Sequence, residues 1–69
     1  MTPQENKKVE SYLRRLFDMP RIGVRARPRK DDSAEVYIGE EFIGVLFRDD
    51  DDGEVSFNFQ MAILDIDLD

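Results

Sequence analysis

The sequence contains no cysteine, no histidine and no tryptophan among its 69 residues. Without cysteine the chain can form neither a disulfide framework nor a thiolate metal site. Without histidine or cysteine it also lacks the usual catalytic bases and nucleophiles, and no glycine-rich phosphate loop or paired-carboxylate motif can be recognised. We therefore expect a protein that is not an enzyme and that has no catalytic residue and no cofactor.

Long apolar runs and targeting features are also missing. The apolar run at residues 42–47 is far shorter than the roughly 20 residues that a membrane-spanning helix needs. Residues 1–5 are mostly polar and do not resemble the apolar core of a signal peptide. We expect no membrane partner and a cytoplasmic location.

Size and charge limit the remaining possibilities. A chain of 69 residues predicts a single domain, 1–69, near the lower size limit for an unassisted apolar core. Residues 1–30 carry nine Lys or Arg and three Asp or Glu, whereas residues 31–69 carry one basic and thirteen acidic residues. The net charge of −6 disfavours nonspecific binding to nucleic acid.

The N-terminal residues have the pattern of a helix start. Thr2 is placed as the N-cap, Pro3 at the first helical position, and Glu5 where it can complete a capping box. Pro20 limits the helix to about residue 18, which predicts a helix at about 3–18. Its apolar side chains recur at helical spacing and form one stripe: Val9, Tyr12, Leu13, Leu16 and Phe17.

From residue 21 the apolar period changes to two, which is typical of strands with one buried face. The pattern predicts strands at about 21–28, 33–39, 42–48 and 54–62, followed by a C-terminal tail, 64–69. The loop between the second and third predicted strands has two residues, either 39 and 40 or 40 and 41. This order predicts an α+β fold, in which the N-terminal helix packs on a four-stranded antiparallel meander sheet.

The hairpins also predict which side chains face the helix. Val36 and Ile38 share this inner face with Ile43, Val45 and Phe47, and a loop at 49–53 would place Phe47 opposite Val55 and Val45 opposite Phe57. In the tail the apolar residues fall on the alternate positions opposite to those of the preceding strand. This change indicates a bulge or short turn near Ile63, or a helical turn through 60–64.

The outer face of the sheet carries the candidate binding residues, which are Arg25, Arg27, Tyr37, Phe42 and Leu46. The arginines have two interpretations: a cross-strand ion pair with Glu35, or a phosphate or RNA patch with Tyr37 for stacking. The apolar residues Phe42 and Leu46 also have two interpretations. Either the C-terminal tail folds back over them, or they bind another protein or a second copy of the chain.

The acidic turn at 49–53 is a weak metal candidate. With Gly53 at position six of a calcium loop, Arg48 and Phe59 would occupy positions one and twelve, where carboxylates belong. We therefore expect an exposed hairpin turn that favours solubility, and no metal site.

Two segments resemble a known family. Residues 31–49, DDSAEVYIGEEFIGVLFRD, and residues 59–65, FQMAILD, are similar to a family of small bacterial proteins of unknown function. The resemblance implies a free-standing bacterial domain and brings no activity, cofactor or site residue. The predicted function is a protein-interaction or accessory module, and the alternative is RNA or phosphate binding through the Arg25/Arg27 face.

Overall fold

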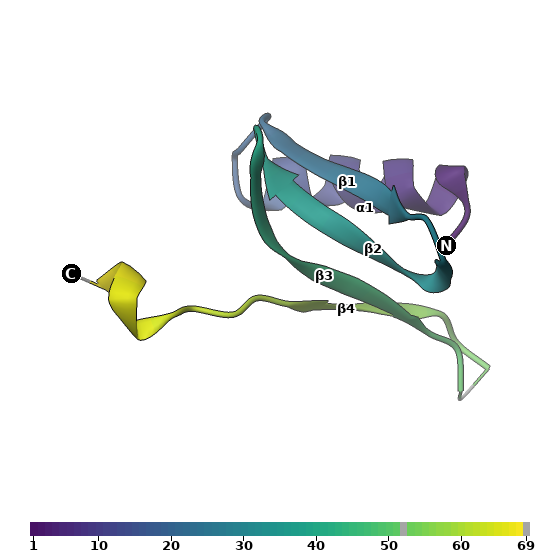
Figure 1. The fold of residues 1–69 in the computed structure, drawn as a ribbon. Coiled ribbons are helices and arrows are strands. Elements are labelled where there is room, and N and C mark those ends of the chain that lie inside the picture. Colours follow the sequence, from purple (N-terminus) through teal and green to yellow (C-terminus); the bar gives the residue numbers. More distant parts are fainter. Residues whose placement is uncertain (52, 69) are drawn as a thin grey trace.

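The computed structural model describes residues 1–51 and 53–68. Its elements are the helix α1 (Pro3–Leu16), the strands β1 (Ile22–Arg27), β2 (Lys30–Ile38), β3 (Glu41–Asp49) and β4 (Ser56–Gln60), and the short 3-10 helix η1 (Asp65–Leu68). The strands form one antiparallel sheet in the order β1-β2-β3-β4, with α1 on one face (Figure 1). The predicted α+β fold with a meander sheet is confirmed.

Local backbone hydrogen bonding determines both ends of α1. At the start, the Thr2 side chain accepts from the Glu5 amide at 3.1 Å and the Glu5 side chain accepts from the Thr2 amide at 2.9 Å, which is the predicted capping box. At the end, Asp18 has a left-handed φ of 52°, and the Met19 amide donates to the Arg14 carbonyl at 2.9 Å. This Schellman arrangement ends the helix at Leu16, two residues before the limit predicted from Pro20.

Two side chains of α1 hold the outer edge of β1. The Val24 amide donates to Glu10 Oε2 at 2.9 Å, and Arg14 Nε donates to the Ile22 carbonyl at 2.7 Å. Glu10 and Arg14 also pair with each other at 3.3 Å. These bonds satisfy backbone groups at an edge that would otherwise invite pairing with another chain, and they place the helix over the β1 side of the sheet.

The core lies between α1 and the middle of the sheet. Its buried side chains are Leu13, Ile22, Val36 and Leu46, and partly buried side chains such as Val9, Phe57 and Phe59 pack around them. A helix about 10 Å across covers about two strands spaced ~4.8 Å apart. The inner face of β3 and β4 is therefore only partly covered.

A bulge in β3 overturns the predicted facing of that strand. Tyr37 pairs with Phe42 but Val36 pairs with Gly44, so that Ile43 is an extra residue in β3. One extra residue exchanges the two faces of everything that follows. Leu46 is therefore only 2% exposed in the core, and its predicted outer position is wrong.

The same bulge reverses the facing of two more side chains of β3. Val45 lies opposite Glu35 and Phe47 opposite Ser33, so both point to the outer face and their predicted inner positions are wrong. The predicted pairs of Phe47 with Val55 and of Val45 with Phe57 are also wrong.

The observed β3–β4 pairs are Leu46 with Phe59, Phe47 with Asn58 and Arg48 with Phe57. Phe57 and Phe59 nevertheless stay on the inner side, because the altered register compensates for the bulge.

Gly44 allows β4 to approach β3 this closely. A Cβ atom at residue 44 would collide with the Gln60 carbonyl oxygen and would lie 2.6 Å from Phe59 Cε1. Only glycine fits here without movement of β4.

The chain leaves the sheet after Gln60. Residues 61–64 form neither a strand nor a helical turn, so the bulge and the helical turn predicted for this segment are wrong. A short turn does follow, one residue after Ile63, where the Asp67 amide donates to the Leu64 carbonyl at 2.9 Å and η1 begins. We call residues 61–68 the C-terminal arm, which extends away from the sheet (yellow in Figure 1). Its large apolar side chains are between 53% and 79% exposed: Met61, Ile63, Leu64, Ile66 and Leu68.

Candidate functional site

Three of the predicted outer-face residues meet in one cluster. The Arg25 guanidinium lies 3.9 Å from the centre of the Tyr37 ring, and the Tyr37 and Phe42 rings are in edge contact with centroids 5.6 Å apart. The other two predicted residues lie elsewhere. Arg27 donates to Ser33 Oγ at 3.1 Å, and Leu46 is buried on the opposite face.

The polar groups of this cluster already have partners within the protein. Arg25 contacts the Gly39 carbonyl at 3.4 Å and the Glu40 carboxylate at 3.6 Å. The Tyr37 hydroxyl donates to Glu35 at 3.1 Å, and this hydrogen bond, together with partial desolvation, raises the pKa of Tyr37 above its ordinary value. Arg25 lies opposite Glu35 in the sheet, but its ion pair is with Glu40 of the β2–β3 turn, so the predicted pair with Glu35 is wrong. A bound phosphate would have to compete with these contacts, so the geometry favours a structural role for Arg25.

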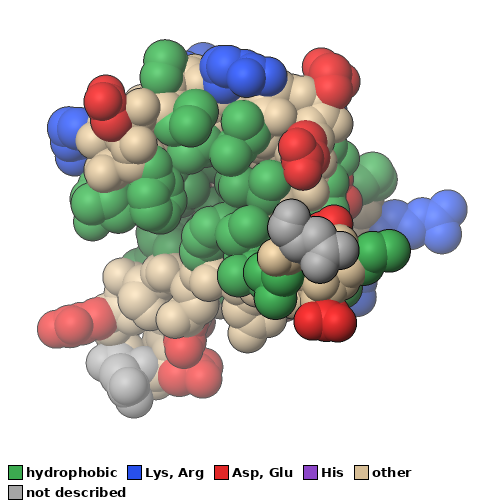
Figure 2. Space-filling view, turned by 90° about the vertical axis from the view of Figure 1, so that its left-hand side faces the viewer, with side chains coloured by type: hydrophobic (Ala, Val, Ile, Leu, Met, Phe, Trp, Pro, Cys, Tyr) green, Lys and Arg blue, Asp and Glu red, His purple; other side chains and the backbone are tan. Residues whose placement is uncertain are grey.

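A groove with a mainly apolar lining lies between α1 and β4. It has a volume of about 430 Å³, and we call it the α1–β4 groove. Hydrophobic side chains gather on this side of the molecule, and the surface between them is hollowed (Figure 2). The groove is lined by residues of α1, of the turn that follows it, of β3 and of β4: Lys8, Val9, Tyr12, Leu13, Leu16, Phe17, Leu46, Phe57 and Phe59.

The groove exists because the sheet covers only part of the helical stripe. Leu13 is buried, but Tyr12, Leu16 and Phe17 keep 50%, 57% and 53% of their surface exposed. Lys8 lies at the groove, and the Arg15 guanidinium lies 5.6 Å from the Tyr12 ring centre. The arrangement is an apolar floor with cationic side chains beside it, which can bind apolar groups that carry negative charge nearby.

Sequence reasoning identified these stripe residues but missed the groove, because it assumed that the sheet would cover all of them. The available signal was the mismatch in width between one helix and four strands. Phe57 and Phe59 were correctly placed on the inner face, although their surroundings were not predicted.

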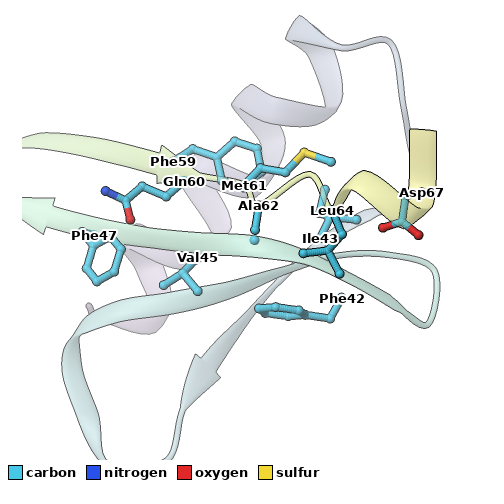
Figure 3. A pocket seen from close by; sticks show the side chains of 11 residues that line it. Phe42, Ile43, Val45, Phe47, Phe59, Gln60, Met61, Ala62, Leu64 and Asp67 are labelled. Atoms are coloured by element: carbon cyan, nitrogen blue, oxygen red, sulfur yellow. The ribbon is translucent and has the colours of Figure 1, made fainter.

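A second hollow, of about 850 Å³, lies between the start of β3, the end of β4 and the C-terminal arm. Figure 3 shows Phe42 and Ile43 on β3 on one side of this hollow and Leu64 and Asp67 of the arm at its end. Phe42 remains 51% exposed. The arm therefore does not fold back as a cover over the outer face, as one of the two predicted interpretations required.

The acidic turn is organised by Arg48. This arginine contacts Glu5 and Asp50, each at 2.9 Å, and thereby links the turn to the start of α1. The hydrogen bond from the Thr2 amide and then that from Arg48 hold the pKa of Glu5 below its ordinary value. Within residues 1–51 and 53–68 no group of three acidic side chains is arranged to hold a metal ion. Asp52, part of the predicted turn, lies outside the described residues.

Comparison with known proteins identifies a family and nothing beyond it. A model of the family described as "Protein of unknown function (DUF3126)" matches residues 5–67, nearly the whole chain. Comparison with curated proteins and with solved structures gave no match. Among the described residues, no helix combines the length and apolar character needed to cross a membrane.

Proposed function

This chain belongs to the DUF3126 family, whose function is unknown, and we propose that it is a protein-interaction module that binds a segment of another chain in the α1–β4 groove. The observation that carries this proposal is the groove itself, where half-exposed Tyr12, Leu16 and Phe17 lie along the same hollow as Phe57 and Phe59. An apolar groove of this kind, bordered by polar residues, is characteristic of a binding surface.

The lining of the groove defines the chemistry of the bound segment. Aromatic and leucine side chains bind apolar side chains by removing both surfaces from water, and aromatic residues are enriched at the centres of protein interfaces. Lys8 and Arg15 beside the groove favour carboxylates on the segment. The expected ligand is a short peptide segment with two or three apolar side chains and neighbouring acidic residues.

The competing RNA or phosphate function has less support. Arg25 is held by Tyr37, Glu40 and the Gly39 carbonyl, and Arg27 donates to Ser33.

A peptide-display selection against the immobilised full chain tests this proposal. We expect enrichment of peptides that combine apolar and acidic residues, and loss of their binding in Leu16→Gln. Phe42→Gln is the matched control, because Phe42 is about as exposed as Leu16 but lies on the outer face. Selection of no peptide above background, or of peptides whose binding depends on Phe42 and not on Leu16, would overturn the proposal.

A further inference from the structure

We infer that the α1–β4 groove is occupied by the C-terminal arm of a second copy of this chain, with the exchange made in both directions to form a symmetric dimer. This inference rests on the proposed function of the groove and names its partner. It follows from the chemistry of the arm, from its direction and from the charge on each side.

The arm has the chemistry that the groove requires. Leu64, Ile66 and Leu68 alternate with Asp65 and Asp67, so the arm offers apolar side chains with carboxylates between them. All three apolar side chains are more than half exposed, at 57% for Leu64, 79% for Ile66 and 66% for Leu68, and the groove residues Tyr12, Leu16 and Phe17 are at least half exposed. Binding of the arm in the groove would remove the apolar surfaces of both from water.

Charge favours the same pairing. Helix α1 carries four basic and two acidic residues, whereas residues 61–69 carry three aspartates and no basic residue. The acidic arm of one copy therefore meets the basic helix of another, and Lys8 and Arg15 lie close enough to the groove to contact arm carboxylates.

The direction of the arm favours a second copy over the arm's own groove. The arm extends away from the sheet beyond the end of β4 (Figure 1), and its Leu64 and Asp67 line the hollow at the start of β3 (Figure 3). Residues 61–64 are Met, Ala, Ile and Leu, and they include none of the residues that favour a tight reversal. Four residues at up to ~3.3 Å each and the four residues of η1 at ~2.0 Å each give the arm a reach of up to ~21 Å, which is long enough to contact a neighbouring molecule.

A reciprocal exchange closes the assembly at two copies. Each arm fills the groove of the other copy through the same surface, so the two contacts are identical and both grooves are covered. One substitution in the groove or in the arm therefore weakens two contacts in the dimer.

Sedimentation equilibrium of the full chain measures this assembly. We expect a dimer for the wild type and for Phe42→Gln, and about a tenfold or larger rise in the dimer dissociation constant for Leu16→Gln and for Ile66→Gln. Both substituted side chains are exposed, so circular dichroism should show that both variants are folded. A dimer that persists unchanged in both variants would overturn the inference, because its interface would lie elsewhere.

A mixing experiment tests the exchange directly. The ¹⁵N-labelled Ile66→Gln chain keeps its groove, and the unlabelled Leu16→Gln chain keeps its arm. We expect the mixture to shift the amide resonances of α1 and β4 in the labelled chain, whereas addition of unlabelled Ile66→Gln should not shift them. An absence of shifts in the first mixture would contradict the exchange.

The two proposals can fail separately. A wild-type chain that stays monomeric at every concentration, yet binds selected peptides through Leu16, would overturn the second-copy inference and leave the protein-interaction function supported. An arm that occupied the groove of its own chain would likewise keep the protein monomeric and overturn the second-copy inference. A chain whose dimer persists in Leu16→Gln and whose groove binds no selected peptide would instead contradict both proposals.

Discussion

Replacement of Gly44 by alanine tests the close approach of β3 and β4. The new Cβ atom would lie 2.6 Å from Phe59 Cε1 and would also collide with the backbone carbonyl oxygen of Gln60. Nonbonded carbon atoms are normally ~3.5 Å or more apart, so the end of β4 must move by roughly 1 Å. Overpacking of this kind destabilises a protein by about 1–3 kcal/mol, and we expect a loss in that range for Gly44→Ala.

Gly23→Ala is the matched control, because a Cβ atom there meets only Glu10 Oε2 at 3.8 Å, an ordinary contact distance. This variant should be neutral or gain about 0.4–1 kcal/mol by restricting the unfolded chain. Urea unfolding followed by circular dichroism gives both free energies, and each kcal/mol should move the melting temperature by about 4–8 °C in a domain of this size. Unfolding free energies within about 0.5 kcal/mol of each other for the two variants would refute the packing described here.

Three further predictions concern the core, the helix end and the pH dependence. Leu46→Ala should lower the unfolding free energy by about 2–5 kcal/mol in urea titrations, because Leu46 is buried, whereas half-exposed Phe42→Ala should lower it far less; equal losses would contradict the assigned faces. Asp18→Gly should raise the melting temperature in a thermal scan, because glycine adopts the left-handed φ of 52° without strain; a decrease would contradict the Schellman ending. Because Thr2 and Arg48 lower the pKa of folded Glu5, wild-type stability should fall as the pH drops below the ordinary value of 4.5 and through the lowered pKa. Glu5→Gln should lose less stability over that range, and parallel pH profiles in chemical denaturation would contradict the stated cause.

Local patterns were sufficient to predict α1 and the order of the strands. The capping box of Thr2 and Glu5 depends on residues three apart, and each hairpin is encoded by a change of period and a turn. The end of α1 was less well predicted, because Asp18 adopts a left-handed conformation that is more usual for glycine.

The facing of β3 could not be predicted from alternation. Both sets of alternate residues in this strand are apolar, so either set could form the buried face. One set contains Phe42 and Leu46, and the other contains Ile43, Val45 and Phe47. The choice depends on the bulge at Ile43, which is a tertiary feature of the sheet.

The bulge also explains why only some of the candidate site residues were placed on the correct face. Arg25, Tyr37 and Phe42 lie before the bulge, and their predicted proximity is observed. Leu46 lies after it and was assigned to the wrong face. The α1–β4 groove depends on how far one helix extends across four strands, and residue periodicity carries no information on that width.

Nuclear Overhauser contacts from the methyl groups of β3 test the central claim most directly, because the position of the groove depends on which face of this strand meets the helix. We expect contacts from Leu46 to α1 side chains such as Leu13, and contacts from Val45 to the outer-face neighbours of Glu35. Contacts from Val45 to α1, with Leu46 on the outer face, would contradict the bulge, the groove and the binding function proposed for it.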